Sequence, residues 1–430
     1  MVLQKRFQIV PFLSALFLVL VLPWTTQAEP NDSPWRQEEN GCLNCHLTLG
    51  GRYGLVAQEW QGSIHARHAV ACADCHGGDP QASTSEEAMS PQADFIGLPV
   101  KSEIPQLCGG CHADPERMGP YGLPANQLKE YSEESKHGRL LAEGDENVAT
   151  CYDCHGGHRI LEAQSPNSTV YPLNLPQTCA QCHSDSKLME PYDIDTHQYE
   201  SFRQSVHGIA LLSEHNLRAP NCATCHGIHG PSLPGLGELL DICGAECHPQ
   251  TEEAYLSGGH RSGMAGNLAA PTCITCHGRY DVQEADERML LGDGANHCGA
   301  CHASGSPEGE IVSTIYEEIS STASSVAEAR ALVDAARLNE RNVDDEEHKL
   351  RQAETRLMEA RVLQHAVEID LIQGKTAEAR ELSAQVQRDL QDAGPMASYE
   401  IQAVLVMGLI IAVSFLGFIL ITVARGVVRG

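Results

Sequence analysis

Nine times between Cys42 and His302, the sequence places two cysteines close together with a histidine directly after the second. Eight motifs have the spacing CxxCH, and the seventh, CGAECH, has one additional residue. The cysteine pairs, which use all 18 cysteines of the chain, are Cys42 and Cys45, Cys72 and Cys75, Cys108 and Cys111, Cys151 and Cys154, Cys179 and Cys182, Cys222 and Cys225, Cys243 and Cys247, Cys273 and Cys276, and Cys298 and Cys301. The histidines that follow are His46, His76, His112, His155, His183, His226, His248, His277 and His302.

The spacing of these motifs suits covalent attachment of haem. Two thiols one turn apart can each add to a vinyl group, while the next residue brings an imidazole to the iron. Zinc sites and disulfides also use CxxC pairs, and a secreted chain favours disulfides. Neither of them requires a histidine after every second cysteine. We therefore expect nine covalently bound c-type haems, with the motif histidines as proximal iron ligands.

The N-terminal segment, residues 1–28, has the composition of a cleavable signal peptide. Lys5 and Arg6 precede an apolar run from Phe7 to Leu22, and a small residue, Ala28, marks the exit. An uncleaved anchor is the alternative, although the run is short for a membrane span. Export from the cytoplasm agrees with haem attachment through paired thiols.

The C-terminal segment, residues 399–424, contains an uncharged run from Ile401 to Ala424. This length predicts a transmembrane helix, with a buried core helix as the alternative. Arg425 and Arg429, in the remaining residues 425–430, are typical of a cytoplasmic tail. The expected location is the inner membrane, with the haem domain in the periplasm.

The haem domain is expected to span residues 29–309 and to be mainly α-helical with extensive loops. Its 281 residues give about 31 for each of nine haems, and aromatic residues make up only 5% of the chain. Haem would therefore supply much of the apolar interior. The formal net charge of -28 makes nucleic acid an improbable partner and leaves a basic redox protein or a plain solvated acidic surface as alternatives.

A two-haem repeat occurs four times after the first motif. Each repeat begins with a histidine in the setting SxH or SGGH, continues with a motif followed by glycine, and ends with a second motif. In the second and third repeats the first motif extends to His158 and His229, whereas Asp79 and Tyr280 take this position in the first and fourth. The first and fourth repeats therefore need another residue to supply this second iron ligand.

Ten histidines of the haem domain lie outside the motifs and are candidates for the distal iron ligands. We expect six in this role, namely His65, His137, His158, His207, His229 and His260. Further candidates are His68, His197, His215 and His297, together with the methionines Met118, Met189 and Met264. If every iron has two imidazoles, no position is open to a substrate, and electron transfer is the expected role.

The composition changes to Ala, Glu, Arg, Leu and Gln in residues 310–394, which predicts helices. Apolar residues recur in steps of three and four through Ile315, Ile319 and Val326 and again from Leu350. This pattern predicts a helical hairpin or coiled coil, with a third helix after Gly374. His348 and His365 are expected to be ordinary helix residues, although His365 reaching a haem is an alternative.

The pattern SxHG, then CxxCHGxH, then CxxCH, over about Gly41 to His302, resembles the periplasmic multihaem c-type cytochromes of bacterial respiration. The long helices after the last motif look like those of cytochrome c nitrite reductase and hydroxylamine oxidoreductase relatives. That second resemblance implies a catalytic haem with an open distal face, which in nitrite reductases often has lysine in place of the motif histidine. No motif here ends in lysine, so a nitrite reductase in particular is disfavoured.

The leading hypothesis is a membrane-anchored nonahaem cytochrome that relays electrons between a quinone-reactive inner-membrane protein and periplasmic redox proteins. A helix-mediated oligomer is a further option. The alternative hypothesis is a multihaem reductase of a small nitrogen or sulfur oxyanion at one haem with an open coordination position.

Overall fold

The computed structural model describes residues 40–235, 237–263, 270–291, 297–392 and 405–417. These residues form helices, turns and loops, and no strand occurs among them. The chain divides into two contact units, Met1–Pro99 with Gly157–Leu161, and Val100–Gly156 with Glu162–Gly430. The mainly helical, loop-rich character of the haem region agrees with the expectation from its composition.

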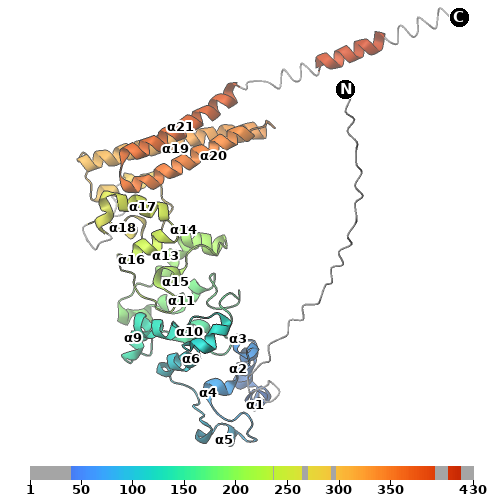
Figure 1. Cartoon of the computed structure of the whole chain (residues 1–430), viewed down its shortest axis with the longest axis vertical. Coiled ribbons are helices and arrows are strands. Elements are labelled where there is room, and N and C mark those ends of the chain that lie inside the picture. The colour runs from blue at the N-terminus through green and yellow to red at the C-terminus, as the bar shows by residue number, and fades with distance from the viewer. Residues whose placement is uncertain (1–39, 236, 264–269, 292–296, 393–404, 418–430) are drawn as a thin grey trace, which may run out of the picture. The chain divides into compact units, whose positions relative to one another are not determined.

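The first unit contains two antiparallel helices and several short ones (Figure 1). They are α1 (Gly41–Leu49), α2 (Gly51–Gln61), α3 (Ile64–Arg67), α4 (Cys72–His76), α5 (Ser85–Ala88) and η2 (Pro91–Ala93). The Asn40 side chain caps α1 by accepting a hydrogen bond from the backbone N–H of Leu43. Leu43, Ala57 and Trp60 form a small apolar cluster between α1 and α2. This cluster packs α1, which carries the first motif, against α2.

The second unit begins with a series of short helices that carry the remaining motifs (Figure 1). They are η3 (Lys101–Glu103), α6 (Ile104–His112), α7 (Pro115–Met118), η4 (Gly119–Tyr121), α8 (Gln127–Lys129), η5 (Glu130–Glu134), α9 (Lys136–Ala142), α10 (Cys151–His155), α11 (Leu175–His183), α12 (Ser186–Met189), η6 (Glu190–Tyr192), α13 (Gln198–Gln204), α14 (Val206–Gly208), η7 (Ile209–Ser213), α15 (Cys222–His226), α16 (Glu238–Leu240), η8 (Asp241–Ala245), α17 (Pro249–Ser257), η9 (Gly259–Gly263), α18 (Cys273–His277), η10 (Glu287–Leu290) and η11 (Cys298–Ala300). None of them exceeds nine residues.

Three long helices close the second unit. They are α19 (Pro307–Leu338), α20 (Asp344–Leu363), which continues into η12 (Gln364–Ala366), and α21 (Ile369–Asp392). Their shared core includes Ile319, Leu357 and Val386, one from each helix. The third helix begins before Gly374, because Ile372 is buried in this core and tertiary packing outweighs the low helix propensity of one glycine.

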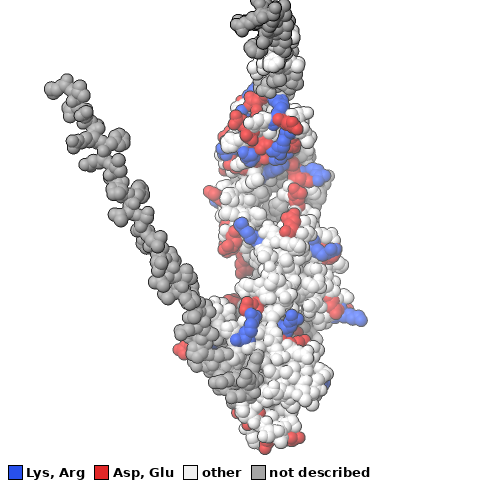
Figure 2. Space-filling view, turned by 90° about the vertical axis from the view of Figure 1, so that its right-hand side faces the viewer, with Lys and Arg blue, Asp and Glu red and all other residues white. Residues whose placement is uncertain are grey.

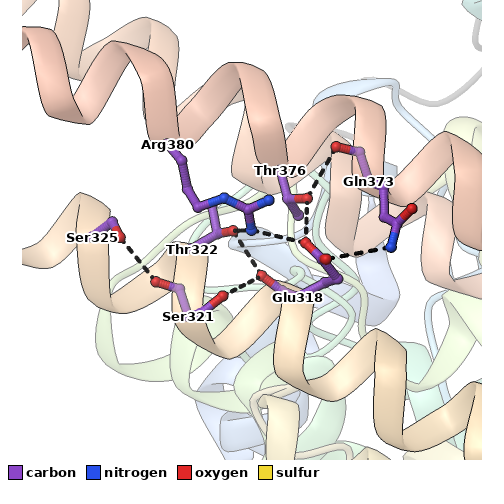
Figure 3. A network of polar contacts seen from close by, with 7 residues as sticks. All are labelled: Glu318, Ser321, Thr322, Ser325, Gln373, Thr376 and Arg380. Atoms are coloured by element: carbon purple, nitrogen blue, oxygen red, sulfur yellow. Dashed lines mark hydrogen bonds and ion pairs between the residues drawn. The ribbon is translucent and has the colours of Figure 1, made fainter.

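A polar network joins α19 to α21 beside this core (Figure 3). Arg380 Nη1 donates to the Glu318 carboxylate at 2.8 Å, and Thr376 Oγ1 donates to the same carboxylate oxygen at 3.0 Å. Burial raises the pKa of Glu318, but the hydrogen bonds from Arg380 and Thr376 outweigh it and hold the pKa below its ordinary value. Glu318 is therefore ionised at neutral pH and fixes the register of α21 on α19.

Replacing Glu318 by Gln is expected to lower the free energy of helix unfolding by about 1 kcal/mol at pH 7, since the charge-assisted bonds from Arg380 are lost. A carboxyl with a depressed folded-state pKa stabilises the fold above its unfolded pKa of about 4.3 and loses this effect as the pH falls through the folded value. The difference from the unsubstituted protein should therefore shrink on acidification. Urea unfolding followed by circular dichroism measures it. The control is Glu381→Gln on the exposed face of α21, for which no change is expected; equal effects of the two substitutions would contradict a special role of Glu318.

The expected transmembrane helix at residues 399–424 is wrong. Within the ranges that the structure describes, no helix is long and apolar enough to cross a membrane. The described helix of this segment covers residues 405–417. The same finding overturns the predicted inner-membrane location, and the predicted signal peptide and tail, 1–28 and 425–430, lie outside the described residues.

Candidate haem-binding site

The first motif of each repeat folds into a short helix of the same kind. α4, α10, α15 and α18 each start at the first cysteine of a motif and end at its histidine. The glycine that follows has a positive φ in all four cases, +65° at Gly77, +83° at Gly156, +88° at Gly227 and +79° at Gly278. Glycine adopts this conformation without a Cβ clash, so it ends the helix immediately after the imidazole. This is the physical reason for the CHG signature.

The serine of the SxH pattern caps the helix that carries the candidate distal histidine. Ser135 is fully buried, and its hydroxyl oxygen accepts a hydrogen bond from Gly138 N at 2.8 Å. Ser205 accepts from Gly208 N in the same way, and Ser63 from Ala66 N. A serine at the N-cap fixes the first turn, so the histidine two residues later points in a defined direction.

Six motif histidines each face a second histidine in the structure. The pairs, with the distance between ring centres, are His76 and His158 (6.1 Å), His137 and His183 (6.1 Å), His155 and His229 (6.3 Å), His207 and His248 (6.4 Å), His260 and His302 (5.9 Å), and His277 and His365 (6.2 Å). A seventh motif histidine, His226, faces the ring of Tyr280 at 6.2 Å. The narrow range of these distances indicates a common geometry.

The spacing of the pairs fits two imidazoles on opposite sides of one iron. A metal–imidazole bond of roughly 2 Å, plus roughly 1 Å from nitrogen to ring centre, places two such rings roughly 6 Å apart. The apolar side chains around the motifs agree with haem as their neighbour. Leu98, Ile228 and Leu233 are 91%, 76% and 83% exposed, whereas the large core belongs to the three long helices. The residues present therefore fit covalently bound haem.

Hydrogen bonds at Nδ1 orient several of the paired rings. The Nδ1 atoms of His76, His226 and His365 lie 2.9 Å from the backbone oxygens of Gly97, Ser232 and Val362. A carbonyl accepts only from a protonated nitrogen, so Nδ1 carries the hydrogen and Nε2 keeps its lone pair for a metal. Metal-binding histidines are commonly fixed by this arrangement.

Burial favours the neutral form of several of the paired imidazoles, and this is the form that binds iron. Burial lowers the pKa of His137 to about 4 and that of His155 also to about 4. Burial likewise lowers the pKa of His207, His260 and His277. A protonated ring has no free lone pair, so these environments keep the rings competent to coordinate at neutral pH.

The pairs follow a rule that relates them to the repeat. The second motif of a repeat faces the histidine that opens the same repeat, as His183 faces His137. The first motif faces the CHGxH position of the following repeat, as His155 faces His229. The first motif of the first and of the second repeat thus takes its facing histidine from the next repeat.

The structure brings five of the six expected distal histidines opposite a motif histidine, namely His137, His158, His207, His229 and His260. His65, the sixth, lies in α3 behind the Ser63 cap, and its role as a ligand stays a prediction. His197 is 79% exposed and hydrogen-bonds to Asp195, and His215 is also exposed. The roles proposed for His68 and His297 also stay predictions. Met118 and Met189 are buried side chains that end α7 and α12.

His365 is the functional residue that the sequence pattern obscured. It lies in η12 at the end of α20, where its ring faces His277 of α18. The fourth repeat has no successor, and the helical segment supplies the missing imidazole. The sequence does contain a hint of this role. Three of the four first motifs are followed by another repeat that can supply a facing ring, but the fourth is not, so its facing ring must come from elsewhere.

The cysteines of successive motifs also lie next to one another. In the second unit, the thiols of Cys108 and Cys151, of Cys179 and Cys222, and of Cys243 and Cys273 hydrogen-bond in pairs. Burial raises the pKa of Cys154, Cys225 and Cys276, and the thiols of Cys179, Cys243 and Cys298, which lie within electrostatic range, add to the respective shifts. The seven motifs from Cys108 to His302 thus form an unbroken series of neighbours, and in the first unit Cys42 lies close to Cys72.

Comparison with known proteins adds one match. Residues 64–184 match the family model of cytochrome c3, which covers the first repeat and the second up to its last motif. Comparisons with curated proteins and with solved structures give no match. Residues 64–184 are thus similar to a family of multihaem c-type cytochromes, and the paired imidazoles of the structure fit covalently bound c-type haem.

Proposed function

We propose that this protein is a nonahaem c-type cytochrome that conducts electrons along its chain of haems between redox partners. The observation that carries the proposal is the continuity of the motif series. Each motif from Cys108 onward has a cysteine beside a cysteine of the next one. Because the cysteines hold the edge of the porphyrin, neighbouring sulfurs imply neighbouring haem edges.

The protein's own residues hold and tune the haems in this proposal. When bound, each haem supplies a one-electron iron couple whose potential depends on its axial ligands and burial. Paired imidazoles keep the coordination unchanged between the two oxidation states, so little rearrangement opposes transfer. Nδ1 bonds such as that of His76 to Gly97 O hold the rings in place.

The partners would dock by charge and by exposed haem edges. Figure 2 shows charged residues of both signs crowded over the three-helix bundle and more sparsely placed over the motif region on this face. With a formal net charge of -28, the protein favours basic redox proteins as partners and disfavours nucleic acid. Association with such a partner should weaken as ionic strength rises.

Haem counting and redox titration test this function. The purified holoprotein should contain nine haems per chain and should take up nine electrons over a broad range of potential, without a substrate. A basic redox protein should reduce or oxidise it more slowly at high salt. A content below nine haems, or a group of haems that exchanges no electrons with the rest, would refute the continuous nonahaem chain.

A further inference from the structure

The ring that faces His226 is a tyrosine, in a position where the other described pairs have histidine. Tyr280 stands two residues after the CHG glycine, Gly278, as His229 stands after Gly227. Its ring is 6.2 Å from that of His226 with an interplanar angle of 19°, close to the 6.3 Å and 17° of His155 and His229. Tyr280 therefore occupies the repeat position at which His229 lies, but its ring has no nitrogen atom to bind iron.

A phenol ring in this position cannot do what an imidazole does. The ring carbons of tyrosine have no lone pair, and its single donor atom is the hydroxyl oxygen at the far end. His226 itself has the orientation of a proximal ligand, with Nδ1 bonded to Ser232 O at 2.9 Å. The iron held by Cys222, Cys225 and His226 therefore has one nitrogen ligand from the paired rings and not two.

The edge-on contact of another tyrosine with a motif histidine has a different geometry. Tyr53 meets His46 at 5.7 Å and 61°, and it lies on the adjoining helix α2, outside the repeat. Tyr280, in contrast, occupies a repeat position and is stacked like a distal imidazole. Because Tyr280 stands at the position that holds His158 and His229 in the second and third repeats, it replaces a distal histidine, whereas Tyr53 does not.

We propose that the haem at Cys222, Cys225 and His226 lacks a nitrogen sixth ligand, and that Tyr280 lines the side of its iron where a small molecule such as carbon monoxide binds. This inference rests on haem attachment in the proposed function. In addition to electron transfer between partners, this iron could then pass electrons to a small molecule bound to it.

Carbon monoxide binding to the reduced holoprotein tests the inference, because carbon monoxide binds an iron with an open or weakly held sixth position. The wild type should bind it, and the stoichiometry should fall by one per chain in Tyr280→His, with one high-spin ferric haem converted to low spin. Tyr280→Phe should keep the binding. The reciprocal variant His229→Tyr should gain one site.

The outcomes separate this inference from the proposed function. Nine bound haems with no carbon monoxide binding, or binding unchanged in Tyr280→His, would overturn the open site and leave the relay intact. Loss of haem at Cys222 and Cys225 would refute the proposed function instead.

Discussion

Replacing His365 by Met should raise the potential of one haem, the one attached at Cys273 and Cys276. His365 is the ring that faces His277 at 6.2 Å, and Val362 O orients it with Nε2 free. A thioether donates less charge to the iron than an imidazole and favours the reduced state. The expected shift is of the order of 100 mV, within the roughly 0.8 V over which axial ligands move haem potentials.

Redox titration followed in the near infrared measures this shift and identifies methionine ligation of the oxidised haem. The matched control is His348→Met, because His348 lies exposed on the same helix α20 and bonds only to Gln352 among the described contacts. The control should reproduce the wild-type titration. Identical titrations of both variants would show that His365 binds no iron.

Replacing Gly138 by Ala should destabilise the second repeat and displace a distal ligand. A Cβ at this position would stand 1.9 Å from Tyr131 O, which is backbone and cannot rotate away. The helix α9 must move, and His137 moves with it from its place opposite His183. We expect a loss of about 3 kcal/mol in stability, at the upper end of overpacking effects, and one haem converted from low to high spin.

Thermal unfolding and electron paramagnetic resonance of the oxidised protein report these two effects. Gly119→Ala is the control, since Gly119 has a φ of -55° and no neighbour that an added Cβ would meet within 4 Å. Gly208→Ala should behave as Gly138→Ala does, because its Cβ would meet Phe202 O at the same 1.9 Å. A wild-type spectrum for Gly138→Ala would contradict the role of this glycine.

Local chemistry explains how much of the site could be predicted from sequence. Ser135 and Gly138 act within one helical turn, as do Cys151 and His155, so a short pattern records both the cap and the haem attachment. His137 was expected to be a ligand for this reason. Its partner, His183, depends on the path of the 45 residues between them, which no local rule fixes.

The sequence by itself predicted where haems would attach, because covalent attachment needs only two cysteines and a histidine on one turn. It also determined the repeat, including the tyrosine at position 280. Tertiary structure decided which ring faces which motif, and it placed His365 of the helical segment at the last unpaired first motif. It also overturned the membrane span that a run of apolar residues had suggested. Coordination joins residues far apart in the chain, so only the folded arrangement of repeats selects the second ligand.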